Sequence, residues 1–164
     1  MIAFIIALFG IALAVVCCGF ASVRAVADLG QLSDGVMTEQ PELFGKLLLL
    51  TALPGTQGIY GFLAGFIGIV KLGLLSGGPE AQWQILKNTG SIWDGVQFLL
   101  ACLPVALCGY YSAIRQGNVC ATGITMTAKQ PDSAGKGLVL GVFVEFYAIL
   151  GLLTSILLIN SVQY

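Results

Sequence analysis

Glu145 is an acidic residue inside a long uncharged stretch, and a carboxylate in such a place can bind or carry a cation. It lies nine residues beyond Lys136, and no charged residue follows it. A helix rises about 1.5 Å per residue, so Glu145 would lie on the order of 13 Å deeper than Lys136. A charge at that depth in an apolar environment is costly unless it is paired or neutralised. Glu145 is therefore the first functional candidate, and a structural Glu held by a packing partner or kept protonated is the alternative.

A second group of polar residues interrupts another uncharged stretch, in the segment from Leu53 to Gln57. Pro54 has no backbone N–H, so it would leave the carbonyl of Leu50 without its helical partner. Thr56 and Gln57 add side-chain oxygens beside it. Such groups are unusual in the middle of an apolar segment, and they favour a binding site over simple packing.

The chain offers a third polar residue at a depth similar to that of Glu145. Gln116 lies 15 residues before Pro131, and Glu145 lies 14 residues after it, so a turn at Gln130-Pro131 would bring both to one level. Together the candidates form an oxygen-rich cluster made of Glu145, Thr56, Gln57, Gln116 and a main-chain carbonyl. Oxygen ligands suit a hard cation. The cluster contains no Cys or His, which argues against zinc or copper.

The elements that must position these residues follow from composition. The chain has 164 residues, of which 57% are hydrophobic and 9% charged, and its mean hydropathy is +0.94. A soluble domain of this size could not bury so much apolar surface. Four uncharged or nearly uncharged runs reach the roughly 20 residues that a membrane-spanning helix needs: Met1 to Val23, Leu47 to Val70, Gly95 to Ile114, and Gly137 to Tyr164. Nothing shows the alternation of barrel strands, so the sequence predicts an all-α membrane protein.

The chain also repeats itself with an offset of 90 residues, which aligns Cys18 through Phe62 with Cys108 through Leu152 without a gap. The repeat predicts a single membrane domain made of two tandem hairpins, residues 1–75 and 88–164. Both hairpins would cross the membrane in the same direction. Gly55 is the counterpart of Glu145, so two hairpins share one carboxylate. Small residues along the first and third helices would let these helices form the crowded inner circle of a ring. An ordinary four-helix bundle is the alternative.

Lys and Arg distribution predicts the orientation in the membrane. Five basic residues flank the first and third loops, and two flank the middle loop; the five are Arg24, Lys46, Arg115, Lys129 and Lys136, and the two are Lys71 and Lys87. We therefore expect the first and third loops in the cytoplasm and both termini outside the cell membrane.

Other features exclude several classes of function. The first run has no basic segment before it and is long for a signal peptide, so a retained helix is expected. The five cysteines have no CxxC spacing and are expected to be packing residues: Cys17, Cys18, Cys102, Cys108 and Cys120. The net charge is −1, and no basic patch suggests a nucleic-acid partner.

The chain resembles one known family over almost its whole length, and three segments carry the resemblance most clearly. They are LPGTQGIYGF at 53–62, the Gln-Gly pair at 116–117, and VEFYAILGLL at 144–153. With the duplicated hairpin, they resemble the proteolipid ring subunit of V-type ATPases, also called the K or c subunit, and most closely its Na⁺-translocating bacterial branch. The resemblance implies a rotor-ring subunit without catalytic chemistry of its own. It also implies a homo-oligomeric ring, a stator ion-channel subunit, central-stalk subunits and membrane lipids as partners.

The resemblance further implies a role for each candidate residue. In the sodium branch, the ion is held by the residues that match Glu145, Thr56, Gln57, Gln116 and the carbonyl of Leu53, while the Tyr that matches Tyr60 hydrogen-bonds the carboxylate. All of these residues are present. Arg115 departs from the pattern, because an uncharged residue usually precedes the Gln. A helix turns about 100° per residue, so Arg115 and Gln116 would face different ways, and we interpret Arg115 as an anchor toward the headgroups or the ring lumen.

Three other interpretations stay open at this stage. A proton-carrying ring of the same type would need the carboxylate and not its oxygen-bearing companions. A self-contained four-helix, proton-coupled transporter would explain a buried acid but not a parallel duplication with one carboxylate. A purely structural or pore-forming ring would explain the duplication but not the polar cluster.

Overall fold

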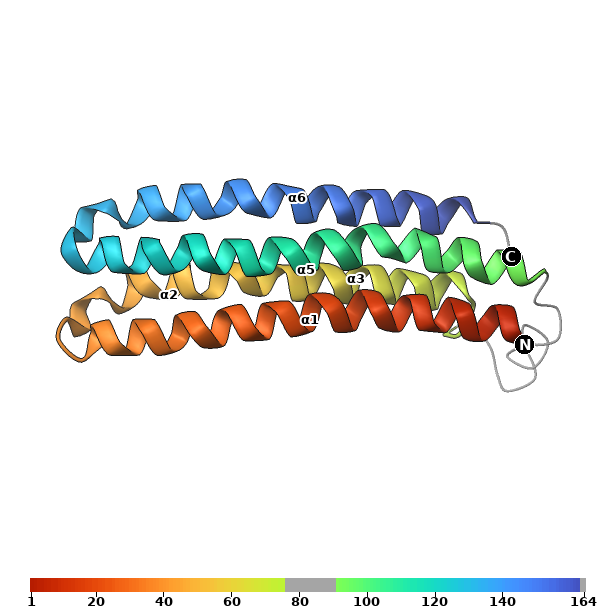
Figure 1. The fold of residues 1–164 in the computed structure, drawn as a ribbon, viewed down its shortest axis with the longest axis horizontal. Coiled ribbons are helices and arrows are strands. Elements are labelled where there is room, and N and C mark those ends of the chain that lie inside the picture. The colour runs from red at the N-terminus through yellow and green to blue at the C-terminus, as the bar shows by residue number, and fades with distance from the viewer. Residues whose placement is uncertain (76–90, 163–164) are drawn as a thin grey trace.

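The computed structural model describes residues 1–75 and 91–162 as a bundle of four long, nearly parallel helical segments (Figure 1). Two of the segments are single helices, α1 (Ile2–Met37) and α5 (Ile92–Lys129). The second segment is divided into a 3₁₀ turn η1 (Pro41–Leu43), α2 (Phe44–Ala52), a 3₁₀ turn η2 (Leu53–Gly55) and α3 (Thr56–Lys71). The last segment is η3 (Pro131–Ser133) followed by α6 (Ala134–Ser161).

Among the described residues, four segments are long and apolar enough to cross a membrane: Ile2–Met37, Pro41–Lys71, Ile92–Lys129 and Pro131–Ser161. This result agrees with the expected all-α class. The helices are longer than the uncharged runs, because α1 continues past Val23 to Met37 and α5 continues past Ile114 to Lys129. Charged residues end an apolar run without ending a helix, since Arg and Lys are good helix formers. Three expectations fall on residues outside those that the structure describes. They are the start of the second hairpin at residue 88, the basic residue Lys87, and the end of the last run at Tyr164.

Two helical hairpins lie side by side, and their tight turns are at the same end of the bundle (Figure 1). The turn between α1 and α2 and the turn between α5 and α6 each contain a Gln-Pro pair, Gln40-Pro41 and Gln130-Pro131. Proline at the first position of each 3₁₀ turn fits because its missing N–H needs no helical partner there. The first residue and the last described residues lie at the opposite end. This arrangement is the parallel repeat that the sequence predicts.

The offset of 90 residues also describes the packing inside each hairpin. A Cβ placed on Gly61 of α3 would lie 2.6 Å from the carbonyl oxygen of Ala14 and 3.0 Å from Cys18 Sγ. A Cβ placed on Gly151 of α6 would lie 2.8 Å from the carbonyl oxygen of Pro104 and 3.2 Å from Cys108 Sγ. These contacts of Gly61 in the first hairpin thus have their counterparts 90 residues later, at Gly151. Glycine lets both helix pairs approach closely, as small residues do in membrane helices.

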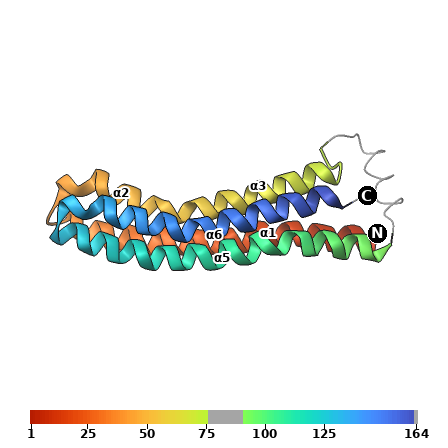
Figure 2. The ribbon, with the colours of Figure 1, turned by 90° about the horizontal axis from the view of Figure 1, so that it is seen from above.

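The helix that carries the second group of polar residues bends near its middle (Figure 2). Pro54 lies in η2, between α2 and α3, and its side chain is buried. Proline interrupts the regular hydrogen-bond pattern of a helix, and kinks are commonly found at such positions. The bend places backbone carbonyls and the first residues of α3 beside the two helices of the second hairpin.

Candidate ion-binding site

A cluster of polar side chains lies where α3 meets α5 and α6, among otherwise apolar helices. Glu145 of α6 is 8% exposed, and Gln57 of α3 and Gln116 of α5 are fully buried. Buried polar groups persist in proteins when they are hydrogen-bonded to one another. All three side chains form such bonds here, and the bonds connect the two hairpins.

Glu145 accepts hydrogen bonds at both carboxylate oxygens. The Tyr60 hydroxyl donates to Oε1 at 2.5 Å. The amide Nε2 of Gln116 donates to Oε2 at 3.5 Å and to the carbonyl oxygen of Gly141 at 3.0 Å. The carboxylate is therefore held by a phenol from the first hairpin and an amide from the second. Gln116 and Glu145 lie at one level, as the count of residues from the turn predicts.

Gln57 links α3 to the residues that hold the Glu145 carboxylate. Its Nε2 donates to Gln116 Oε1 at 2.6 Å and to the hydroxyl of Ser112 at 3.2 Å. Thr56 lies next to it, and its hydroxyl donates to the Leu53 carbonyl oxygen at 2.9 Å and approaches Gln57 Oε1 at 3.5 Å. These side chains and the Leu53 carbonyl thus form one connected network.

Ser112 is a member of the network that sequence reasoning missed as a site residue. Its hydroxyl accepts from Gln57 and donates to the carbonyl oxygen of Val144 at 3.0 Å. Ser112 lies four residues before Gln116, a spacing that puts both side chains on one face of a helix. That spacing was the available signal. Ser112 matches Ser22 in the repeat, however, and a repeated small residue is equally well explained by helix packing.

The corresponding place in the first hairpin lacks these polar side chains. The counterparts of Glu145 and Gln116 are Gly55 and Val26, and a Cβ on Gly55 would lie 3.6 Å from a methyl group of Val26. Ser22, the counterpart of Ser112, is buried, and within the described part of the chain its hydroxyl is the buried side-chain oxygen that lacks a partner. The described residues of one protomer therefore contain one complete polar cluster.

Arg115 lies apart from the carboxylate. It is exposed, whereas the neighbouring Gln116 is fully buried. Arg115 lines a groove on the outside of α5 and α6 together with Tyr111 and Tyr147. It thus faces a different direction from Gln116, which agrees with the 100° turn per residue. The five cysteines are free thiols that pack in or beside the helix contacts.

Comparisons with known proteins point to one family. The family model of the ATP synthase C subunit matches residues 9–68 and again residues 99–158, one match for each hairpin. The chain is 39% identical to the V-type sodium ATPase subunit K of Enterococcus hirae over 155 residues, which cover 94% of this chain and 90% of that protein. It is 37% identical to the A-type ATP synthase subunit K of Methanocaldococcus jannaschii over 129 residues, which cover 79% of this chain and 52% of that protein.

The duplicated match, the two hairpins of the fold and the identity over most of both chains agree with one another. The family consists of non-catalytic, ion-translocating proteolipid subunits that form oligomeric rings within ATPase complexes. The chain therefore belongs to the ATP synthase C subunit family, as a duplicated V-type proteolipid of the rotor ring.

Proposed function

We propose that each protomer carries one Na⁺ at Glu145, and that rotation of the ring moves the ion across the membrane, coupled to ATP hydrolysis or synthesis in the complex. Thr56, Gln57, Gln116 and the carbonyl of Leu53 complete the site, and Tyr60 holds the carboxylate. The relative from Enterococcus hirae is named as a sodium ATPase subunit, which favours this ion. Sodium is the cargo here and not a resident cofactor.

The observation that carries the proposal is the number of neutral oxygen-bearing groups around one buried carboxylate. A proton needs only the carboxylate oxygen to which it binds. A sodium ion that leaves water must instead find several oxygens in the protein, because a hard cation is held by oxygen ligands. Two fully buried amides, a threonine hydroxyl and a main-chain carbonyl in a 3₁₀ turn lie in one network with Glu145. These groups would be unnecessary for a proton carrier.

The charge of the cluster also fits a monovalent cation. Within residues 1–75 and 91–162, no three His, Cys, Asp or Glu side chains gather into one group. A single ionised carboxylate with Na⁺ gives a neutral site, which can pass through the apolar interior of a bilayer at much lower cost than a charge. A divalent cation would leave a net positive charge there.

The hydrogen bonds suggest how the site would close over its ion. Tyr60 is half-buried and donates to the Glu145 oxygen that Gln116 does not contact. In the closed site, the phenol keeps the carboxylate turned toward α3 and α5. Release of the ion requires this bond to break, so that the carboxylate can turn away and exchange its ion at a stator subunit. Tyr60 is thus a positioning residue, and Glu145 binds the ion.

The remaining features of the proposal concern partners and orientation. The stator channel and the central stalk would be the contacts of the ring in the complex, and lipids would surround it. The first and third loops would face the cytoplasm and the termini the outside, as the basic residues predict. A proton ring of the same type is the second candidate function, because protonation of Glu145 would also give a neutral site.

The test is to purify the oligomer in mild detergent and to measure both its mass and its bound sodium per protomer. The proposal expects a large symmetric ring with one sodium per protomer. The variant Glu145→Gln should keep the ring and lose both the bound sodium and transport in the reassembled complex. Glu39→Gln is the matched control, because Glu39 is exposed in the turn region. A ring without bound sodium at alkaline pH would favour protons, and a monomer or dimer would overturn the rotor.

A further inference from the structure

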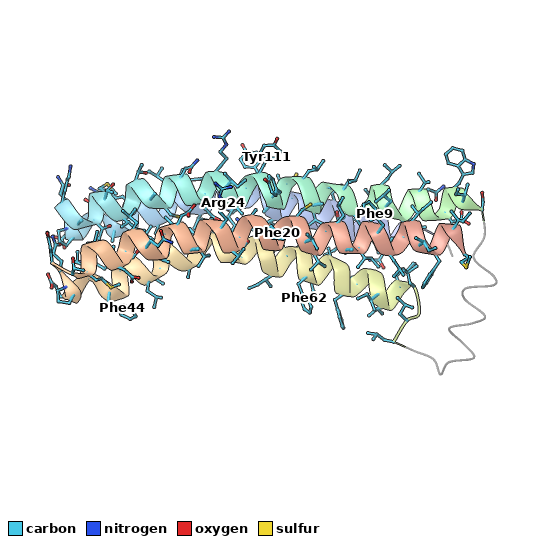
Figure 3. All side chains as sticks on the ribbon, turned by 60° about the horizontal axis from the view of Figure 1, so that its bottom comes forward. Phe9, Phe20, Arg24, Phe44, Phe62 and Tyr111 are labelled. Atoms are coloured by element: carbon cyan, nitrogen blue, oxygen red, sulfur yellow. The ribbon has the colours of Figure 1, made fainter. Side chains whose placement is uncertain are left out.

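Two serines at equivalent positions of α1 and α5 have different surroundings. Ser22 and Ser112 are 90 residues apart, and both are buried, at 5% and 4% exposure. Tyr111, the residue before Ser112, is 62% exposed and points away from the bundle (Figure 3). A helix turns about 100° per residue, so Ser112 faces another way. It is hydrogen-bonded inside the polar cluster, whereas the Ser22 hydroxyl is a buried oxygen without a partner in the described part of the chain.

The hydrogen of the Ser112 hydroxyl is committed to one partner. The hydroxyl donates to the carbonyl oxygen of Val144 at 3.0 Å. A carbonyl has no hydrogen, so this bond cannot run in the opposite direction. The lone pairs of the Ser112 oxygen are left to accept, and the group beside them is the Gln57 amide, at 3.2 Å. Ser112 therefore requires an N–H group from Gln57 and not an oxygen.

This requirement decides which end of the Gln57 amide faces the candidate ligands. Its Nε2 donates to Ser112 and to Gln116 Oε1, so both amide hydrogens are used on that side. Its Oε1 lies on the other side, 3.5 Å from the Thr56 hydroxyl, which in turn donates to the Leu53 carbonyl. An amide turned by half a rotation would present its NH₂ group to Thr56 and Leu53 instead. A cation is bound by the oxygen of an amide and repelled by its N–H groups.

Two groups hold the amide of Gln57 in this orientation, and they differ in how a bound ion would affect them. Gln116 Oε1 accepts from Gln57, but the same oxygen is a proposed ligand, so the ion and the Gln57 N–H group would share it. Ser112 is not among the proposed ligands, and its own anchor is the backbone of α6. The bond from Gln57 to Ser112 can therefore persist whether the site is filled or empty.

We propose that Ser112 is a positioning residue for the ion preference of the site. It passes the fixed direction of the Val144 carbonyl on to the Gln57 amide, so that the amide oxygen and not its NH₂ group faces the ion. Ser112 acts through Gln57 and is not itself a ligand. The inference rests on the proposed function, because it assigns a role toward the sodium ion that Glu145 is proposed to carry.

The role of Ser112 separates sodium from protons. Sodium needs the Gln57 oxygen, so loss of the Ser112 hydroxyl should weaken sodium binding, because the amide then spends part of its time in the wrong orientation. A proton binds the Glu145 carboxylate, which receives its hydrogen bonds from Tyr60 and Gln116 and none from Ser112. Protonation of Glu145 should therefore be unaffected by the same change.

The repeat supplies a matched control for the test. Ser22→Ala removes the same hydroxyl at the equivalent position of α1, where in the described structure it has no hydrogen-bond partner. Ser22 also packs against a helix of the other layer, since a Cβ placed on Gly58 of α3 would lie 3.3 Å from Ser22 Cβ. Ser112→Ala and Ser22→Ala thus make one chemical change in two buried serines of inner helices, and only the first removes a bond to an amide.

Sodium titration of purified rings at alkaline pH tests the role of Ser112. Sodium affinity should fall by roughly 2- to 13-fold in Ser112→Ala, the equivalent of one neutral hydrogen bond, and should equal the parent value in Ser22→Ala. Without sodium, the pH profile of carbodiimide labelling at Glu145 should be the same in all three rings. Unchanged sodium affinity in Ser112→Ala, or an equal fall in both serine variants, would overturn the inference. A shifted labelling profile would also overturn it, because Ser112 would then act on the carboxylate.

A double-variant cycle shows whether Ser112 acts through Gln57. In rings that carry Gln57→Leu, the amide is gone, so adding Ser112→Ala should cause no further loss of sodium affinity. A further loss as large as that in the parent background would refute the route through Gln57. If Ser112→Ala prevents assembly, Ser112→Cys keeps a side chain of similar size with a poorly accepting thiol, and it should show a fall in the same direction. Parent rings that bind no sodium would refute the proposed function itself, whereas normal binding by the parent and by both Ser112 variants refutes only the role of Ser112.

Discussion

Tyr60 of α3 donates a hydrogen bond of 2.5 Å to Glu145 of α6, so a phenol from one hairpin holds the carboxylate of the other. The bond exists only because the repeat is asymmetric. The counterpart of Tyr60 in the second hairpin is Leu150, and the counterpart of Glu145 in the first is Gly55. Each hairpin supplies one member of the pair, so the polar cluster requires both hairpins.

Tyr60→Phe removes this hydroxyl and leaves the ring otherwise unchanged. One intramolecular hydrogen bond contributes about 0.5 to 1.5 kcal/mol, and up to about 3 kcal/mol when its partner is charged. We therefore expect sodium affinity to fall by roughly 2- to 150-fold, as measured by sodium titration of purified rings. Tyr110→Phe makes the same chemical change at a tyrosine that contacts Tyr111 and not the cluster. Equal affinities of the Tyr60 variant and the parent ring would remove Tyr60 from its positioning role.

Sodium should protect Glu145 against a hydrophobic carbodiimide, because this reagent attacks a protonated acid and bound sodium keeps the carboxylate ionised and shielded. At fixed pH, the rate of labelling should fall as sodium rises, and equal concentrations of potassium chloride control for ionic strength. The labelled residue is identified by peptide mass, with Glu145→Gln as the unlabelled control. A rate that depends on pH and not on sodium would identify a proton ring.

Gly151→Ala should destabilise the subunit. The added Cβ would lie 2.6 Å from Cys108 Cβ and 2.8 Å from the carbonyl oxygen of Pro104, so α5 and α6 must move apart. Overpacking of this kind typically costs about 1 to 3 kcal/mol. Thermal denaturation in detergent, read by helical circular dichroism, measures the loss. Gly45→Ala is the control, because a Cβ there meets nothing within 4 Å, and a loss as large in the control would refute the packing argument.

The sequence predicted the architecture well because its signals are long and redundant. Four apolar runs and an ungapped repeat specify the same two hairpins, and no single residue decides the outcome. The uncharged runs do not mark the helix ends, because α1 and α5 continue through charged residues such as Arg24 and Arg115. The length of an uncharged run indicates how much of a helix lies in the apolar part of the membrane. The helix itself extends as far as its backbone hydrogen bonds continue.

The part of the candidate site that depends only on the depth of a residue along its helix could be predicted from the sequence. Counting from Pro131 brought Gln116 and Glu145 to one level, and Gln116 Nε2 lies 3.5 Å from Glu145 Oε2. The bonds of Ser112 and of the Gly141 carbonyl were not predictable, because they depend on helix rotation and on the approach of α5 to α6. The assignment of sodium ligands stays a proposal that the sodium titrations and the labelling experiment address.

The selectivity of the site is best tested at Gln116, whose side chain joins α3, α5 and α6. Its amide accepts from Gln57 at 2.6 Å and donates to Gly141 and Glu145. Gln116→Leu keeps a similar volume but removes an oxygen that sodium would need. Losing one buried polar contact costs about 1 to 3 kcal/mol, so sodium affinity should fall by roughly 5- to 150-fold.

Proton occupancy should suffer less, because a proton requires only the carboxylate. The Gln116 variant should therefore need more sodium, or a lower pH, before Glu145 is neutralised. Sodium titrations of both rings at alkaline pH, where protons compete least, measure the difference, and ring mass confirms that each variant assembles. Gln97→Leu is the matched control, since Gln97 is exposed on the same helix and far from the cluster. If the parent and Gln116→Leu rings bind sodium equally, Gln116 is no ligand, and its hydrogen bonds serve only to join α3, α5 and α6.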